Sequence, residues 1–426
     1  MTIAVFTFSL LGAMALGMPI AFALLVCGIA LMHSLGIFDS QIVAQNIING
    51  ADSFPLMAVP FFMLAGEIMN KGGLAKRIVD IALAVVGHVR GGLGYVTILA
   101  SCALASLSGS AAADAAALAA LLVPMMVAAG HKKMYAAGLV AAGGIIAPVI
   151  PPSIGFVLFG VAGGVSISKL FLAGIVPGLL LGVGLCFAWW WVARGEDIER
   201  PPRKSIREIA WAIVDGFWAL MLPVIIIVGL RFGIFTPTEA AVVVAVYALF
   251  VATCIYRELK LSQLYEVFVS AALSTSVVMF LVAAALVSSW LITVAEIATQ
   301  VVDLVRPFMG NQTFLMLAIM ILVVVVGTAL DMAPTILILT PILMPIIKQA
   351  GIDPVYFGVL FIINNAIGLI TPPVGVVLNV VCGVSRISME DIIKGVWPFM
   401  IAQLVVLFLM VLFPQLVIVP AKWFGG

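Results

Sequence analysis

The sequence predicts an all-α polytopic membrane protein, and three features support this fold class. The chain has 426 residues, 64% of them hydrophobic and only 9% charged, with a mean hydropathy of +1.30; a soluble domain carries about 25% charged residues. Apolar runs long enough to cross a bilayer core of about 30 Å recur along the chain. Gly, Pro and small polar residues interrupt several runs, which predicts helices that break inside the membrane.

The first 90 residues predict scaffold helices and an arm. Residues 3–34 are apolar around Gly17-Met18-Pro19, so they form either one kinked span or two short ones. A second apolar run follows at about 55–69. Within 71–90 only about ten apolar residues separate charged ones, and ten helical residues rise about 15 Å, half of a span. We expect 71–90 to be an interfacial arm, with a short buried helix as the alternative.

The next segment has the pattern of a re-entrant hairpin followed by a broken helix. Two short apolar halves, 93–105 and 111–126, flank Ser106-Leu-Ser-Gly-Ser110, which would form the polar tip of the hairpin. The apolar run 134–147 then meets Pro148-Val-Ile-Pro-Pro-Ser153. Prolines in mid-span remove backbone donors and break a helix, and such breaks persist at membrane depth only inside protein or beside a wet cavity.

The same pattern returns after four predicted spans at 169–192, 212–232, 236–256 and 264–294. Apolar halves at 314–326 and 335–347 flank a second polar tip at 327–334. The apolar run 355–367 then meets a second break, Gly368-Leu-Ile-Thr-Pro-Pro-Val-Gly375. Sliding 124–177 by 221 positions lays it on 345–398 with ten identities, among them both Pro-Pro pairs. Because Gly and Pro determine backbone shape, this match predicts an internal repeat.

Basic residues predict the orientation of the two units. If the linker around Arg203, Lys204 and Arg207 is cytoplasmic, counting spans places 15 of the 20 Lys and Arg on that side. The other five, Lys169, Arg231, Arg306, Lys348 and Lys422, fall outside. Five crossings then separate the two units, so the repeats are predicted to be inverted, an architecture of secondary transporters.

Several function classes are disfavoured. The formal charge of +1 and the lack of a basic tail argue against a nucleic-acid partner. The five cysteines lie singly in apolar segments, which argues against disulfides or a zinc site. No nucleophile elbow, HExxH, P-loop or dinucleotide fingerprint occurs, so the chain is not expected to be an enzyme and no cofactor is predicted.

Oxygen atoms and helix ends at the tips and breaks are the candidate site. Freed carbonyls can coordinate sodium ions, and helix N-termini attract anions. In the first unit the hydroxyls of Ser106, Ser108 and Ser110 face Gly143-Gly144 and the break at 148–153; in the second unit Gly327, Thr328 and Asp331 face Asn364, Asn365, Gly368 and Thr371. Each of these residues has an alternative role in close packing or helix capping, but their convergence in two equivalent units favours function.

The acidic residues in apolar segments have two kinds of expected role, one in the functional site and one at the start of a helix. Asp at mid-bilayer costs about 2.5–3.5 kcal/mol, so Asp331 at the second tip is the best functional candidate. Asp114, one turn past the first tip, could instead cap its own helix. In Phe235-Thr-Pro-Thr-Glu239, Pro237 and Glu239 indicate a helix start. Neither hairpin tip nor break contains Lys or Arg, so an anionic substrate would be held by dipoles, hydroxyls and bound cations.

Four motifs in order resemble a known family: Ala105-Ser-Leu-Ser-Gly-Ser110, Ile146-Ala-Pro-Val-Ile-Pro-Pro-Ser153, Phe235-Thr-Pro-Thr-Glu239 and Leu369-Ile-Thr-Pro-Pro-Val-Gly375. They resemble the large membrane subunit of tripartite ATP-independent periplasmic (TRAP) transporters, of the DctM/SiaM type in the ion-transporter superfamily. The resemblance covers essentially the whole chain. It implies a multi-pass protein of the bacterial inner membrane that works as a sodium-driven elevator transporter.

The resemblance also implies site residues and partners. It places one sodium site at Ser106, Ser108 and the carbonyls of Gly144, Pro148 and Pro151, and a second at Gly327, Thr328, Gly368 and Thr371. It places substrate contacts on Ser110, Ser153 and Asp331, to which we add Asn365. The implied partners are a DctP-type periplasmic binding protein and a separate DctQ-type small membrane subunit; the implied substrate is an organic acid, in the branch that moves sugar acids such as sialic acid or keto-gulonates.

The resemblance implies a division into scaffold and transport segments. The expected segments are 1–90 for N-terminal scaffold helices and the arm, 91–165 for transport unit 1, 166–310 for scaffold helices with a cytoplasmic linker at 194–208, 311–386 for transport unit 2, and 387–426 for a C-terminal scaffold helix. The alternative function is a stand-alone sodium/dicarboxylate symporter of the same superfamily. A channel, a non-transporting assembly subunit and a membrane-embedded enzyme fit the pattern less well.

Overall fold

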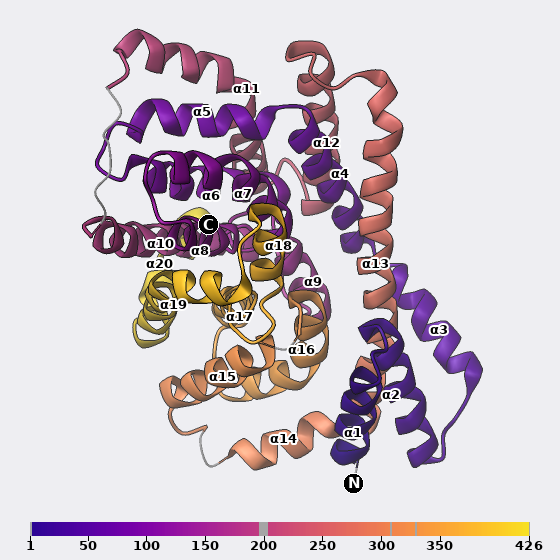
Figure 1. The fold of residues 1–426 in the computed structure, drawn as a ribbon. Coiled ribbons are helices and arrows are strands. Elements are labelled where there is room, and N and C mark those ends of the chain that lie inside the picture. The colour runs from indigo at the N-terminus through magenta and orange to yellow at the C-terminus, as the bar shows by residue number, and fades with distance from the viewer. Residues whose placement is uncertain (1, 196–202, 307–308, 329, 426) are drawn as a thin grey trace.

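The computed structural model describes residues 2–195, 203–306, 309–328 and 330–425, and all regular structure within these ranges is helical (Figure 1). Seven of the described helices are long and apolar enough to cross a membrane, or eight if the bent pair α3 and η1–α4 counts as one span. The helices have these bounds: α1 Thr2–Ala15, α2 Ile20–Leu35, α3 Ser40–Ala51, η1 Phe54–Met57, α4 Ala58–Lys71, α5 Leu74–Val86, α6 Gly92–Ser108, α7 Ala111–Ala128, α8 Lys133–Gly144, α9 Ile154–Gly163, α10 Ile167–Ala193, α11 Ile206–Arg231, α12 Pro237–Phe250, η2 Val251–Ile255, α13 Leu261–Val294, α14 Ile297–Val305, α15 Gln312–Gly327, α16 Met332–Gln349, α17 Pro354–Gly368, α18 Val376–Ser385, α19 Met389–Leu412 and α20 Gln415–Gly425.

The N-terminal apolar run forms two short helices. The helices α1 and α2 pack along each other, and the Cys27 thiol lies 3.4 Å from the carbonyl oxygen of Phe6. Of the two arrangements that the sequence allowed, the structure therefore has two short helices. The polar stretch that follows folds as α3, whose N-terminus is capped by Asp39 through the backbone N–H of Gln41.

The predicted arm is the amphipathic helix α5. It buries Leu74, Ile78 and Val79 against neighbouring helices that include α6 and α11, and it exposes Lys76 and Asp80. A second short amphipathic helix, α14, precedes the second hairpin and was not predicted. In Figure 1, α5 lies near the top of the molecule and α14 at its bottom, as inverted units require. The inversion itself remains a prediction.

Two boundaries differ from the sequence prediction. The helix α11 begins at Ile206, so the expected linker at 194–208 ends three residues early; Ser205 and Glu208 form a capping box that starts the helix there. Residues 196–202 of that linker lie outside the described residues. The expected single C-terminal helix is two, α19 and α20, separated at Phe413-Pro414: Phe413 leaves the helical region with φ of −122° and ψ of 75°, because the following proline disfavours a helical backbone at the residue before it.

Three consecutive tryptophans, Trp189, Trp190 and Trp191, stand just before Arg194, a pattern that predicts an aromatic anchor at the membrane interface. The prediction is wrong for Trp189. Its side chain is fully buried and its indole N–H donates to the carbonyl oxygen of Gly91 at 2.8 Å. Its neighbours Trp190 and Trp191 are exposed. Trp189 therefore holds the start of α6 against the end of α10.

The two broken helices meet in the core through aromatic rings. Phe159 of α9 lies 6.0 Å from Phe357 and 5.7 Å from Phe361, both on α17, measured between ring centroids. Gly358 leaves the space that Phe159 occupies, because a Cβ there would lie 2.4 Å from the phenyl ring. This cluster joins the two units next to the candidate site.

Helices α10 and α19 pack mainly against the hairpin and broken-helix elements. Helix α19 contacts α8, α10, α17 and α18, whereas α10 has only a small contact with α11. Both helices lie in segments that were expected to belong to the scaffold. The division into a scaffold and a transport domain remains a prediction.

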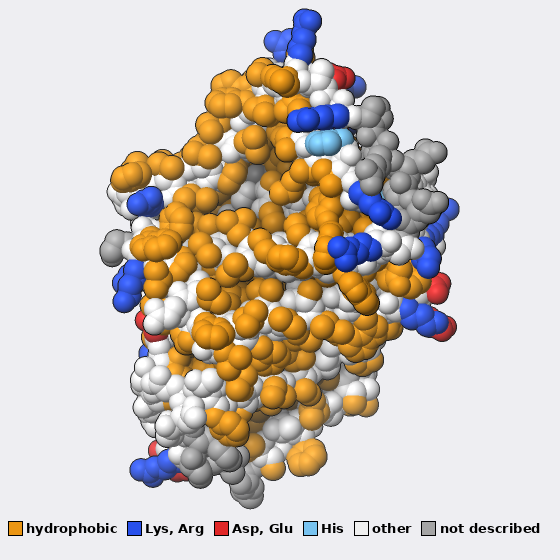
Figure 2. Space-filling view, turned by 90° about the vertical axis from the view of Figure 1, so that its left-hand side faces the viewer, with side chains coloured by type: hydrophobic (Ala, Val, Ile, Leu, Met, Phe, Trp, Pro, Cys, Tyr) orange, Lys and Arg blue, Asp and Glu red, His pale blue; other side chains and the backbone are white. Residues whose placement is uncertain are grey.

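The surface matches a membrane protein. Figure 2 shows the face formed by the helices at the left of Figure 1, where hydrophobic side chains cover the middle and charged ones gather around the margins. Along α10, for example, Leu179, Val183 and Phe187 are exposed. Exposed apolar side chains on this scale fit contact with lipid or with another membrane subunit.

Candidate functional site

The tip of the first hairpin packs directly against the first break. Gly109 ends α6 with φ of 63°, and Ser110 caps α7 by accepting from the N–H of Ala113 at 3.4 Å. A Cβ on Gly109 would lie 2.5 Å from the carbonyl oxygen of Pro152. Because Gly tolerates positive φ and has no Cβ, only it allows the tip this close to the break.

The first break is closed within the protein. Ser153 is fully buried and caps α9: its hydroxyl accepts from the N–H of Phe156 at 3.2 Å and donates to the carbonyl oxygen of Pro148. The Pro151-Pro152 peptide bond is cis. Gly144, at the end of α8, lies against α7, where a Cβ would be 2.7 Å from that of Ala115. The break thus sits beside the hairpin tip, as predicted.

The second unit repeats this contact. Gly327 at the end of α15 lies against Gly368 at the end of α17: a Cβ on Gly368 would be 2.9 Å from Cα, C and O of Gly327. The Thr328 hydroxyl donates to the carbonyl oxygen of Val325 at 2.8 Å, and that of Thr371 donates to Ile367 at 2.8 Å. The Pro372-Pro373 peptide bond of this break is also cis.

Asp331 caps α16 and is exposed, with Oδ1 accepting from the N–H of Met332 at 2.8 Å. The neighbouring Met332 reaches the other unit, since its terminal methyl lies 3.2 Å from where a Cβ would stand on Gly155. Gly155 is two residues from Ser153. The structure therefore packs α16 of the second unit, which Asp331 caps, against α9 of the first unit, which Ser153 caps.

Asn364 and Asn365 are buried near the end of α17, just before the second break. Their amide nitrogens donate to the carbonyl oxygens of Met320, at 2.6 Å, and Phe361, at 2.8 Å. Both Oδ1 atoms are buried, and within the described part of the chain neither has a hydrogen-bond partner. A buried amide oxygen without a donor is costly unless a ligand supplies the missing contact.

Sequence reasoning missed two buried polar residues next to the first break. Gln403 of α19 donates from Nε2 to the carbonyl oxygen of Ala142 at 2.8 Å. The hydroxyl of Ser101 lies 2.3 Å from where a Cβ would stand on Gly143. Gln403 could have been noticed as a lone polar residue inside an apolar span. Ser101 could not, because its position follows from the packing of α6 on α8.

Of the remaining candidate residues, some lie near the first tip and others lie at the starts of helices. Ser106 is buried and donates to the carbonyl oxygen of Ala103 at 2.6 Å, near the first tip; the side chain of Ser108 lies outside the described residues. Glu239 forms a capping box with Thr236, which confirms its predicted structural role at the start of α12. Asp114 is buried in the first turn of α7.

The groups at the tips and breaks are of kinds that hard cations and anions use as partners. Four helices, α7, α9, α16 and α18, begin at the tips and breaks, and their N-termini carry partial positive charge. Hydroxyl, amide and carbonyl oxygens supply ligands of the kind that hard cations prefer. Within the described residues no group of three His, Cys, Asp or Glu side chains could hold a metal ion.

Comparison with known proteins shows the family and the fold to which the chain is similar. The family model for the DctM component of the tripartite ATP-independent periplasmic transporter matches residues 7–416. The chain is 56% identical to the 2,3-diketo-L-gulonate TRAP transporter large permease protein YiaN of Escherichia coli, over 99% of this chain and 100% of that one. It is 38% identical to the sialic acid TRAP transporter large permease protein SiaM of Vibrio cholerae, over 98% of each. The crystal structure of the YdaH transporter of Alcanivorax borkumensis has a similar fold, with a TM-score of 0.61 and 13% identity over 90% of this chain and 88% of that one.

Proposed function

Because the chain belongs to the DctM family of TRAP transporters and is a large permease subunit, we propose that it carries out sodium-coupled uptake of an organic acid across the bacterial inner membrane. A periplasmic binding protein delivers the acid, and a small membrane subunit packs on the chain. The observation that carries the proposal is the meeting of two hairpin tips with two broken helices, at Gly109 with Pro152 and at Gly327 with Gly368.

Sodium coupling is supported by the oxygen atoms at these contacts. The hydroxyls of Ser106 and Thr328 donate to carbonyls, so the lone pairs of their oxygens stay available to a cation. The Oδ1 atoms of Asn364 and Asn365 lack donors among the described residues. We place one sodium ion at the first contact and a second at the other, with Gly368 and Thr371 among its ligands.

The acid would be held without a basic side chain. No Lys or Arg occurs in 105–112, 143–156, 326–333 or 364–377. Helix N-termini and the bound cations therefore supply the positive charge, while Ser110, Asp331 and Asn365 supply polar contacts. Binding of the acid then depends on prior binding of sodium, which couples the two.

Transport would proceed by an elevator motion. Hairpins α6–α7 and α15–α16, with the broken helices α8–α9 and α17–α18, would slide as one body against a scaffold that includes α1–α4 and α11–α13. The aromatic cluster of Phe159, Phe357 and Phe361 supports this, because it fastens the two broken helices to each other.

For the substrate we propose a sugar acid, and among sugar acids a keto-gulonate before sialic acid. The relative named for 2,3-diketo-L-gulonate is 56% identical, and the one named for sialic acid 38%. Both acids carry one carboxylate beside several hydroxyls, which suits a site built from dipoles and hydroxyls.

The test is uptake of labelled acid into proteoliposomes under an inward sodium gradient. 2,3-Diketo-L-gulonate and N-acetylneuraminate are compared, each with and without the small subunit and the cognate binding protein. Uptake that requires sodium and all three components supports the proposal. Uptake by this chain alone would instead indicate the stand-alone symporter. Sodium-independent uptake would contradict the coupling.

A further inference from the structure

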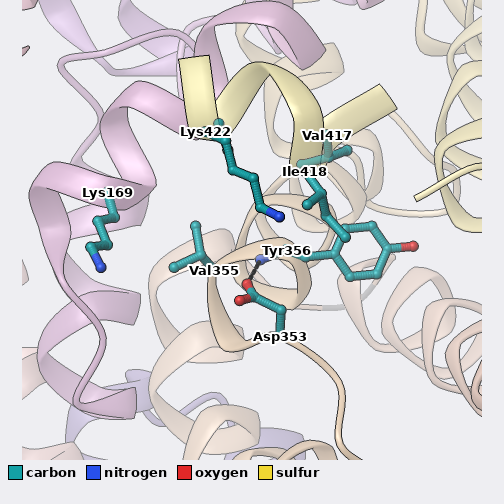
Figure 3. Close-up of a pocket in the computed structure, with 8 residues that line it drawn as sticks. Lys169, Asp353, Val355, Tyr356, Val417, Ile418 and Lys422 are labelled. Carbon is teal, nitrogen blue, oxygen red and sulfur yellow. Dashed lines mark hydrogen bonds between the residues drawn. The ribbon is translucent and has the colours of Figure 1, made fainter. Parts of the chain in front are cut away.

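A cavity of about 170 Å³ lies far from the tips and breaks, where α10, α17 and α20 come together (Figure 3). Lys169 of α10 and Lys422 of α20 line it from different helices. The rest of its wall is Asp353, Tyr356 and the aliphatic side chains of Val355, Val417, Ile418 and Ala421. The cavity thus combines two ammonium groups with an apolar wall.

The charges in the cavity favour an anion. Neither lysine forms an ion pair with a described residue, and both side chains are exposed. The carboxylate of Asp353 is engaged as the cap of α17, accepting from the N–H of Tyr356 at 2.8 Å. The N-terminus of α10, capped by Ser166, adds partial positive charge. The two positive charges of the lysines therefore exceed the one negative charge of Asp353, whose carboxylate already accepts a hydrogen bond.

The position of the cavity along α10 matches the headgroup layer of a bilayer. From Lys169 to Arg194 the helix rises about 38 Å, and a bilayer with its headgroups is about 40–45 Å thick. At the far end, Arg194 stacks on Trp190 at 3.4 Å beside exposed Trp191, as in an interfacial belt. Lys169 then lies at the opposite headgroup layer.

Helix α20 has the features of an interfacial helix at the same level. Trp423 next to Lys422 is 70% exposed. The guanidinium of Arg231, at the end of α11, lies 5.8 Å from the ring centroid of Phe424. Lys169, Arg231 and Lys422 are all on the outer side by the count of basic residues, so this cavity faces the outer leaflet.

We propose that this cavity binds an anionic phospholipid of the outer leaflet, with its phosphate between Lys169 and Lys422 and the start of an acyl chain on the aliphatic wall. A free anion would use the lysines but leave Val417, Ile418 and Ala421 uncovered. The proposal depends on α10 crossing the membrane and is independent of the transported substrate.

The test is the binding of phosphatidylglycerol to the purified, delipidated protein, followed by native mass spectrometry and by the thermal midpoint. The variants are Lys169→Gln with Lys422→Gln, and Ala421→Trp, which fills the cavity without changing its charge. Lys348→Gln is the matched control, because Lys348 is an exposed outer lysine that does not line the cavity. Phosphatidylethanolamine and millimolar inorganic phosphate are the comparison ligands.

We expect phosphatidylglycerol to bind wild type and Lys348→Gln alike, and the double variant roughly 30-fold more weakly, about fivefold per lysine. Ala421→Trp should lose the lipid while keeping both charges. Equal binding to wild type and the double variant overturns the proposal, as does failure of phosphatidylglycerol to bind wild type. Stabilisation by phosphate alone, as large as that by the lipid, also overturns it, because the site would then take a free anion. If the double variant misfolds, Lys422→Gln alone decides the result.

Discussion

Gly327 and Gly368 meet backbone to backbone, and a Cβ on Gly368 would lie 2.9 Å from the carbonyl carbon of Gly327. The contact joins the tip of the second hairpin to the second broken helix, as Gly109 and Pro152 do in the first unit. Both pairs therefore need a residue without a side chain at the point where the proposed ion sites form.

Gly368→Ala should greatly reduce uptake. The added Cβ would meet backbone atoms of Gly327, which cannot move to another rotamer as a side chain can, so the hairpin tip must shift. Overpacking of this kind lowers the free energy of unfolding by about 1–3 kcal/mol. Sodium-dependent uptake and the thermal midpoint measure the two effects. Gly383→Ala is the control, because a Cβ at this glycine, in α18 of the same unit, would have nothing within 4 Å. Equal activity of the two variants would show that the contact does not matter for transport.

Asp331→Ala should abolish or severely reduce uptake while leaving the protein folded. Losing the helix cap costs about 0.5–2 kcal/mol, so Asp331→Asn, which keeps a cap and removes the charge, separates the two roles. If the carboxylate acts in the site, both variants lose uptake. Normal uptake by Asp331→Asn would leave Asp331 as a cap only. Asp39→Asn, at the cap of α3, serves as the control.

Ser106→Ala combined with Thr328→Ala should weaken sodium dependence. Each change removes one hydroxyl oxygen from a proposed ion site, and a hydrogen bond to a charged group is worth about 1.5–3 kcal/mol. The sodium concentration for half-maximal uptake should therefore rise on the order of tenfold or more. A sodium titration of uptake measures this. An unchanged titration curve would mean that carbonyl oxygens alone bind the ions.

Arg77→Ala should loosen the arm α5 and lower the thermal midpoint. The guanidinium reaches Asp215 at 3.1 Å and Glu258 at 2.7 Å, and it lies 3.7 Å from the ring centroid of Tyr256. Both carboxylates are about two-fifths exposed, so screening limits the loss to about 1–2 kcal/mol in total.

The Arg77→Ala effect should shrink at high salt, because screening weakens the ion pairs in the wild type. Lys394→Ala is the control, since its pair with Glu390 is mostly exposed and should contribute almost nothing. Equal midpoints for the two variants would mean that the apolar face of α5 alone holds the arm.

Much of the fold could be predicted, because membrane helices are visible as apolar runs and Gly and Pro mark where they break. Both hairpins and both broken helices lie where the runs predicted them. The elements missed are short and amphipathic or polar: α3, α14 and α20. Their formation depends on partners, as α14 shows by packing on α13 and α16, and isolated helices of this length are marginal.

The burial and contacts of single side chains could not be predicted where helices distant in the sequence surround them. Trp189 was expected at the interface but is buried against Gly91, nearly a hundred residues away. Gln403 reaches the backbone of Ala142 across the packing of α19 on α8. Nothing in the local pattern distinguishes Trp189 from its exposed neighbours, and the polarity of Gln403 does not indicate which helix it contacts.

The sequence by itself determined that the chain crosses a membrane and where its helices break, and it predicted that the site lies at the two tips and two breaks. These properties follow from hydrophobicity and from local backbone preferences of Gly and Pro. Only the tertiary structure decided that Gly109 meets Pro152, that Gly327 meets Gly368, and that Met332 of α16 reaches Gly155 of α9. Such contacts depend on how whole helices pack, and a sequence without its partners in space does not specify that packing.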